Sequence, residues 1–233
     1  MVAADVSDCE IARRLGVTRS TVRDWRKPRY VAKRTARCPR CGTRSRQIVI
    51  EPESYAELLG LYLGDGHITE LARADRLRLF LDAKYPTVVD ESEAILRTVF
   101  PANRVGRIRA EDGRMVVLWA YSSHMTCLFP QHGPGKKHDR RIRLEPWQHE
   151  LIDAAPWAFL RGCIRSDGCV FVNRTGRYEY LSYDFKNLSD EILELFVETC
   201  EAAGLRPRRY AHHARLCRRA DVALLVEHVG LKS

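Results

Sequence analysis

The chain has 233 residues, of which 45% are hydrophobic, and carries a formal net charge of +9. This length allows one large domain with a small one, or two halves of an internal repeat. No apolar run approaches the roughly 20 residues of a membrane-spanning helix, and the N-terminus lacks the basic start and apolar stretch of a signal peptide. The eight cysteines are scattered, with only Cys38 and Cys41 close together, so we expect reduced core residues rather than a disulfide framework.

The positive charge is concentrated at the N-terminal end. Residues 1–52 contain 13 Lys and Arg against 5 Asp and Glu, a balance of +8 that leaves +1 for the rest of the chain. A basic segment of this density favours a polyanionic partner, most simply nucleic acid. The alternative is a solvated basic linker. We expect a cytoplasmic, nucleoid-associated protein that contacts no membrane.

Residues 9–27, CEIARRLGVTRSTVRDWRK, have the pattern of two short helices joined by a turn. Gly16 is expected to end the first helix, Thr18 or Ser20 to cap the second, and Val22 to lie in its buried face together with Trp25. The apolar positions of the first helix are Ile11, Ala12 and Leu15.

This pattern resembles a helix-turn-helix whose second helix, residues 18–27, enters a major groove of DNA. We predict residues 1–30 as this DNA-binding segment, although few residues precede Asp8 to form the bracing helix. The alternative is a two-helix corner of a folded core. The side chains expected to reach bases or phosphates are Arg19, Thr21 and Arg23.

Residues 31–52 are predicted to form a basic linker, because they are rich in Pro, Arg and Lys and lack periodicity. They include Cys38-Pro-Arg-Cys41-Gly, a tight knuckle of the kind that supplies half of a zinc site. Zinc needs four ligands, and the chain has no second Cys-x-x-Cys pair; Cys127 with His132 would complete a site only across a long distance. We interpret the knuckle as a partial zinc ribbon, and bound Zn²⁺ is the less favoured alternative.

Two apolar segments end in the same dipeptide. Residues 54–66, SYAELLGLYLGDG, are long enough for three helical turns, and residues 157–168, WAFLRGCIRSDG, repeat the plan. Small residues at i and i+4 let a partner helix approach closely, so we expect the two helices to pack together. The small residues on these faces are Gly60 and Gly64, and Gly162 and Ser166.

This packing would bring Asp65 and Asp167 together. An acid in the last turn of a helix opposes the helix dipole, and two adjacent acids repel each other. A divalent cation with ligands from both side chains would relieve this repulsion. One Asp-Gly would be an ordinary turn dipeptide, but two in matched frames favour a metal site.

Residues 58–66, LLGLYLGDG, and 160–168, LRGCIRSDG, resemble the two signature helices of the LAGLIDADG homing-endonuclease family. Each has the leucine, the glycine two positions later, the apolar centre and the terminal Asp-Gly. Residues 77–100 then read as a strand and a helix. Residues 179–230 read as a strand, a helix capped by Ser189 and stopped at Gly204, a further strand and a last helix. The resemblance covers about residues 53–233.

The resemblance implies an α+β fold, a pseudo-twofold αββαββα repeat whose two saddle-shaped antiparallel sheets straddle double-stranded DNA, preceded by the helix-turn-helix segment. The first half with its connecting linker would be residues 53–144 and the second half residues 145–233, giving a monomer with an internal pseudo-dimer. Asp65 and Asp167 would be catalytic and would bind Mg²⁺ or another divalent cation, and a metal-activated water would attack a phosphate on each strand.

Members of the family often add a lysine that orders the attacking water. Lys84 and Lys186 follow the first predicted strand after each motif, in DAK and DFK, and are our candidates. The alternatives that we leave open are Lys136 or Lys137, and Arg218 or Arg219.

Two further features concern charge. The Gly- and Pro-rich linker between the halves is expected to touch DNA through basic residues, whereas its two histidines are interpreted as solvated or backbone-bonded. Arg161 and Arg165 depart from the apolar pattern of a closely packed helix, so we expect both to point toward solvent or phosphate. The basic linker residues are Lys136, Lys137, Arg140, Arg141 and Arg143, and the histidines are His132 and His138.

Two functions are compatible with these features. The first is a freestanding, Mg²⁺-dependent, site-specific DNA endonuclease whose recognition is extended by the helix-turn-helix. The second is a catalytically silent DNA-binding transcriptional regulator with the same scaffold. Retention of both aspartates favours the enzyme, and the helix-turn-helix favours the regulator somewhat.

Overall fold

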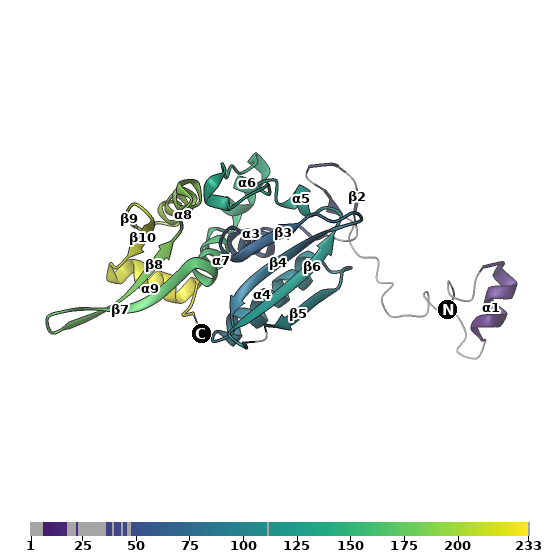
Figure 1. The fold of residues 1–233 in the computed structure, drawn as a ribbon, viewed down its shortest axis with the longest axis horizontal. Helices are drawn as coiled ribbons and strands as arrows, with labels where there is room; N and C mark the ends of the chain where they lie inside the picture. The colour runs from purple at the N-terminus through teal and green to yellow at the C-terminus, as the bar shows by residue number, and fades with distance from the viewer. Residues whose placement is uncertain are drawn as a thin grey trace. The chain divides into compact units, whose positions relative to one another are not determined.

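The computed structural model describes residues 7–17, 22, 36–38, 40–42, 44–45, 48–110 and 112–232. The chain divides into two compact units, Met1–Arg34 and Thr35–Ser233 (Figure 1). No helix within the described ranges combines the length and the apolar character needed to cross a lipid bilayer.

In the first unit, helix α1 (Asp8–Leu15) has caps at both ends. The Ser7 hydroxyl accepts a hydrogen bond from the Glu10 amide at 3.3 Å, and Gly16 closes the helix with a left-handed φ of 65°. Ser is a favoured N-cap because its oxygen satisfies an amide that has no helical partner, and Gly takes this φ without steric cost. The expected helix stop at Gly16 is confirmed.

Burial varies among the described apolar residues of this unit, and the predicted Trp25 lies outside the described residues. Ala12 and Val22 are buried, whereas Leu15 is 58% exposed. Leu15 is the last residue of α1. The predicted DNA-contacting residues Arg19, Thr21 and Arg23 lie outside the described residues.

The second unit contains the same succession of elements twice. The first set is α3 (Pro52–Asp65), β3 (Gly66–Thr69), β4 (Asp75–Asp82), α4 (Pro86–Val99), β5 (Val105–Arg109) and β6 (Met115–Ser122), followed by α5 (Met125–Leu128), a 3₁₀ turn (Lys137–Asp139) and α6 (Pro146–Ala154). The second set is α7 (Pro156–Asp167), β7 (Gly168–Thr175), β8 (Tyr178–Lys186), α8 (Asp190–Ala202), β9 (Arg208–Arg209), β10 (His213–Leu216) and α9 (Arg219–His228). A short strand pair, β1 (Ala36–Arg37) and β2 (Arg44–Ser45), precedes them.

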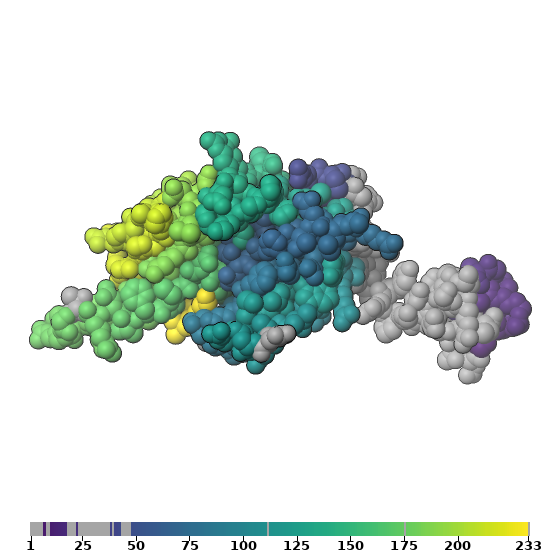
Figure 2. Space-filling view, in the orientation of Figure 1, coloured from purple at the N-terminus to yellow at the C-terminus, as the bar shows by residue number. Residues whose placement is uncertain are grey.

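The two sets form antiparallel sheets with identical topology. Their strand orders are β3-β4-β6-β5 and β7-β8-β10-β9, and they lie on either side of the α3–α7 pair (Figure 1). The predicted α+β pseudo-twofold repeat is therefore confirmed. The hairpin of β7 and β8 projects beyond the rest of the second unit (Figure 2).

The residue pattern by itself did not predict the first strand of each sheet, which only the resemblance implied. β3 and β7 start at Gly66 and Gly168, directly after the helices, where an extended glycine turns the chain without a loop. A strand with no turn in front of it gives no separate signal in the sequence. Consequently Lys84 follows the second strand after its motif, and Lys186 ends the second strand.

Helix α3 is buried on all sides because it lies at the centre of the fold. Its residues from Tyr55 to Leu63 are all buried, as expected for a helix that is apolar all round. The outer helix α8 is amphipathic, and its predicted ends are confirmed. The Ser189 hydroxyl accepts from the Ile192 amide at 3.4 Å, and Gly204 follows the helix with a φ of 82°.

Helices α3 and α7 touch backbone to backbone at their glycines. A Cβ placed on Gly60 would lie 2.6 Å from the Phe159 carbonyl oxygen and 2.8 Å from the Cys163 amide nitrogen. At Gly162 a Cβ would overlap the carbonyl oxygen of Glu57, and at Gly64 it would overlap the side chain of Ser166. The predicted close packing of the two motif helices is confirmed.

This contact predicts the effect of Gly60→Ala. The added methyl group would force the helices apart, and we expect a loss of about 1–3 kcal/mol in the free energy of unfolding, measured by denaturant titration. Gly133→Ala is the control, because its Cβ would lie 3.5 Å from the nearest atom of Arg140. An equal effect of both substitutions would contradict the steric explanation.

Candidate functional site

Asp65 and Asp167 are the last residues of the two central helices, and the packing brings them together. A Cβ on Gly64 would lie 3.1 Å from Oδ2 of Asp167. Burial and the neighbouring Asp167 raise the pKa of Asp65 to about 7, against the opposing charges of Lys232 and Lys137. Burial also raises the pKa of Asp167, opposed by Lys137 and by the hydrogen bond that Asn187 Nδ2 donates to Oδ2 at 2.7 Å.

Two lysines accompany the acids, one from each half. Lys137 Nζ donates hydrogen bonds to the carbonyl oxygens of Tyr62 at 2.6 Å and Gly64 at 2.8 Å. Lys232 Nζ donates to those of Ser166 at 2.8 Å and Gly168 at 3.2 Å. Each ammonium group thus satisfies carbonyls at the end of one central helix, where the helix dipole is negative.

The lysines and acids form one electrostatic group. Burial lowers the pKa of Lys137 to about 8 and also lowers that of Lys232, while both aspartates oppose these shifts. Lys137 is one of the alternatives that the sequence left open, and Lys232 was missed. The repeat could have indicated Lys232. Lys137 follows Asp65 and Lys232 follows Asp167 at similar distances along the sequence, each after the elements of its own half.

Each acid lines a cavity of its own. Asp167 lines one of about 690 Å³ together with Lys136, Lys137 and the predicted Lys186. Asp65 lines one of about 320 Å³ together with Lys232 and the predicted Lys84. Lys84 forms an ion pair with Asp82 of the same cavity, with its Nζ 3.1 Å from Oδ2.

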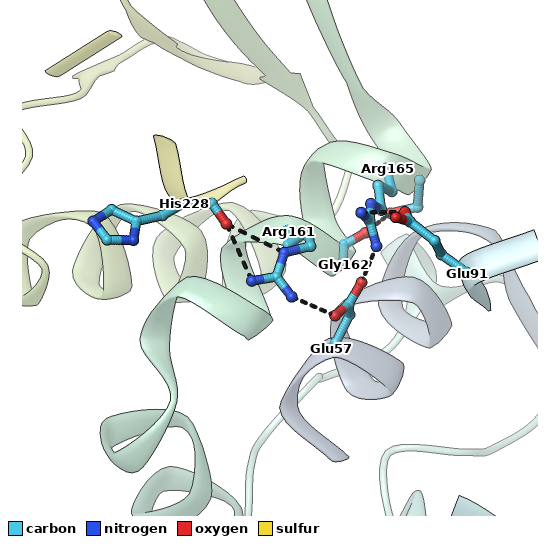
Figure 3. A network of polar contacts seen from close by, with 7 residues as sticks. Glu57, Glu91, Arg161, Gly162, Arg165 and His228 are labelled. Atoms are coloured by element: carbon cyan, nitrogen blue, oxygen red, sulfur yellow. Dashed lines mark hydrogen bonds and ion pairs between the residues drawn. The ribbon is translucent and has the colours of Figure 1, made fainter. Parts of the chain in front are cut away.

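An ion-pair network joins the two helices (Figure 3), and one of its members, Arg165, also lines the cavity of Asp65. Glu57 of α3 is 5% exposed and pairs with Arg161 of α7 at 2.9 Å and with Arg165. Arg165 also pairs with Glu91 of α4, and Arg161 donates to the His228 carbonyl at 3.1 and 3.3 Å. Burial raises the pKa of Glu57, and the two arginines oppose that shift.

The expectation that Arg161 and Arg165 point toward solvent or phosphate is therefore wrong. Their guanidinium groups are held by Glu57 because the buried carboxylate requires a positive partner. Glu57, which forms ion pairs with both arginines, lies on the other helix and far away in the sequence. The sequence of α7 alone therefore could not indicate this pairing.

The sheet faces turned away from the helices carry arginines that were not predicted from the sequence. In β4 the leucines of DRLRLFLD are buried in the core, so Arg76 and Arg78 project from the opposite face. The Nε atoms of Arg76 and Arg78, and of Arg215 in β10, are buried without a hydrogen-bond partner among the described residues. The alternation of apolar and basic residues along β4 could have indicated that these arginines lie on the face opposite the core.

These features agree with solved structures of known fold. The chain resembles full-length DUF199/WhiA from Thermatoga maritima, with a TM-score of 0.51 and 16% identity over 77% of this chain and 56% of that one. The N-terminal LAGLIDADG domain of DUF199/WhiA matches with a TM-score of 0.50 and 14% identity, covering 80% of this chain and 85% of that one. The homing endonuclease I-WcaI bound to its DNA recognition sequence also gives a TM-score of 0.50, with 13% identity over 78% and 84% of the two chains.

The chain has the LAGLIDADG fold. At its N-terminal end, residues 1–30 match a homeodomain-like domain of the helix-turn-helix class, in agreement with the predicted motif. No curated protein sequence matches the chain.

The predicted zinc ligands lie outside the LAGLIDADG helices. Cys38 is buried and Cys41 exposed, and Cys41 Sγ lies 3.6 Å from Nδ1 of His124. Cys127 joins them, but His132 instead faces Glu70 at 3.3 Å. His124, rather than His132, therefore lies beside the cysteines. Spacing along the chain does not show that the residues after β6 meet the knuckle.

The network between the LAGLIDADG helices predicts the effect of Glu57→Gln. Both arginines would lose a buried anionic partner, and we expect a loss of about 3 kcal/mol in the free energy of unfolding. Glu53→Gln is the control, because Glu53 is exposed in the first turn of the same helix. Equal denaturation midpoints for the parent and Glu57→Gln would contradict this expectation.

The raised pKa of Asp65 predicts a pH dependence of stability. The folded chain binds this proton more tightly than the unfolded chain, so the associated stabilisation is complete below the carboxyl's ordinary pKa and is lost as pH rises through about 7. Without added metal, Asp65→Asn should therefore gain stability over the parent as pH rises, measured by thermal unfolding across that range. Asp153→Asn, an exposed acid in the last turn of α6, should show no such trend.

Proposed function

We propose that this chain is a site-specific double-stranded DNA endonuclease that uses Mg²⁺. The observation that carries the proposal is the pair of aspartates at the ends of the packed helices: burial raises the pKa of both carboxyls, and the neighbouring Asp167 raises that of Asp65 further. A protein that only binds DNA gains nothing from two repelling acids. Their retention at matched positions supports a role that uses the negative charge.

The residues present fit a hard divalent cation. Asp65 and Asp167 supply carboxylate oxygens from both halves of the repeat, which is the donor type that Mg²⁺ prefers. Both carboxyls line cavities. When bound, the metal would supply an activated water and would stabilise the leaving oxygen of the phosphodiester.

The lysines complete the chemistry from the chain's own side chains. Lys137 and Lys232 hold positive charge beside the acids, fixed by two carbonyl hydrogen bonds each. A preorganised ammonium group stabilises negative charge that develops on a phosphate. Lys137, with its pKa lowered to about 8, can also release a proton near neutral pH.

Binding of duplex DNA rests on several surfaces. I-WcaI was solved on its DNA recognition sequence with the same fold. In this chain, Arg76 and Arg78 project from the face of β4 opposite the core, and arginine side chains bind phosphates and guanine edges. The projecting β7–β8 hairpin adds stacked aromatic rings of Tyr178 and Tyr180.

We also propose that the first unit and Lys136 contact DNA, as predicted from the sequence. We infer that the chain acts as a monomer, because the repeat already supplies two halves, and that it works at the nucleoid in the cytoplasm.

A second candidate is a DNA-binding regulator that does not cut. The observation that favours it is the charge balance of the site, because two ammonium groups already stand beside two carboxyls. In that case the lysines would replace the cation permanently, and the helix-turn-helix would act with the LAGLIDADG scaffold in binding alone.

Cleavage of supercoiled DNA that carries the gene's own genomic neighbourhood distinguishes the two functions. We expect linear product that requires Mg²⁺ and is abolished by EDTA, with losses of about 100-fold or more in Asp65→Asn and Asp167→Asn. Asp153→Asn is the matched control and should cut normally. Tight binding without any cut, unchanged in both acid variants, would refute the enzyme.

The same variants separate metal binding from cutting when the target is not in that DNA. A ligand that binds only the folded chain raises its melting temperature. Mg²⁺ should therefore raise the melting temperature of the parent and of Asp153→Asn but not that of Asp65→Asn. The regulator predicts no Mg²⁺-dependent difference among the three.

A further inference from the structure

Four side chains with metal-binding atoms gather at the start of the second unit. Cys38, Cys41, His124 and Cys127 place one ligand atom each within 4.8 Å of the others. In the part of the chain that the structure describes, this is the one such group of three or more His, Cys, Asp or Glu side chains. It lies apart from the aspartates and takes no part in the proposed cleavage.

The first pair of ligands stands on a turn shaped to hold a metal. Strands β1 and β2 pair antiparallel, and the knuckle between them begins at Cys38, whose carbonyl accepts a hydrogen bond from the Gly42 amide at 2.9 Å. Gly42 has a φ of 67°, and a Cβ there would meet nothing within 4 Å. The glycine is thus required by backbone conformation, since it lets the turn close directly after Cys41.

The second pair stands at the start of a helix. His124 precedes α5, its amide donates to the Ser122 hydroxyl at 3.1 Å, and its Nδ1 faces Cys41 Sγ at 3.6 Å. Cys127 follows three positions later, in the first turn. Arg40 bridges the two pairs independently, because its Nη1 donates to the Thr126 carbonyl at 3.2 Å.

We propose that Cys38, Cys41, His124 and Cys127 bind one structural Zn²⁺. Three sulfurs and one imidazole nitrogen are a donor set that selects zinc over Mg²⁺. Close thiolates repel one another, and a cation at their centre offsets that repulsion. Four protein ligands complete a tetrahedral shell and leave no position for water or substrate, so the site is structural.

A zinc ion at this position would hold the β1–β2 pair in place. The β1–β2 pair is far too short to form a stable unit by itself, and zinc would fasten it to the end of β6 in the first half. The boundary between the two units lies at Thr35, three residues before Cys38. The zinc site would therefore anchor the first residues of the LAGLIDADG unit, directly after that boundary.

Zinc content of the full-length protein, produced without a metal-affinity tag and dialysed, is the direct measurement. We expect about one zinc per chain in the parent, and a fall of about tenfold or more in Cys41→Ser and His124→Ala. Cys217→Ser, at an exposed cysteine outside the cluster, should keep its zinc. Asp65→Asn should also keep it, which separates this site from the proposed Mg²⁺ site.

Two further measurements keep the outcome decisive if a variant unfolds. X-ray absorption of the parent should give a shell of three sulfurs at about 2.3 Å and one nitrogen at about 2.0 Å. His124→Cys, which preserves a ligand, should retain zinc where His124→Ala loses it. A parent that stays zinc-free after zinc is added, a shell without sulfur, or equal zinc content in every variant would overturn the proposal.

Discussion

The backbone contact between α3 and α7 is the constraint on which the rest of the structure depends. Glycines on both helices allow an approach at which a single added methyl group would overlap the neighbouring chain. Because each helix runs directly into the first strand of its sheet, the contact also fixes how the two sheets stand about the pseudo-twofold axis. It leaves the last residues of both helices side by side, and those residues are acids.

The electrostatics of the molecule follow from that packing. Two carboxyls at adjacent negative helix ends would be costly alone, and two lysines from the ends of the two halves stand beside them. Farther along the same helices, Glu57 is balanced by Arg161 and Arg165, at positions equivalent to Leu59 and Leu63 in α3. The repeat is therefore symmetric at the acids and lysines and asymmetric in its buried ion pairs.

The surfaces proposed to meet DNA are built on this rigid centre. Arginines of β4 and β10 project from faces whose opposite sides are packed on the core, so little freedom is lost when they bind. The cysteine cluster, by contrast, holds a segment that lacks a core of its own. Close packing thus positions the proposed chemistry, while the proposed zinc site anchors the β1–β2 pair to the first half of the repeat.

The sequence by itself determined the features that are written in local patterns. The two Asp-Gly helices, their small-residue faces, the cap at Ser189 and the stop at Gly204 are each encoded within a few residues, and the matched motifs indicated the repeat. The tertiary structure alone decided which distant groups meet: Lys232 beside the aspartates, Glu57 against two arginines, and His124 rather than His132 beside the cysteines. Such pairings depend on where whole elements pack, and no periodicity along the chain records that. The residue pattern did not predict strands β3 and β7 for a related reason. Each strand continues directly from a helix, so no turn residues mark where it begins.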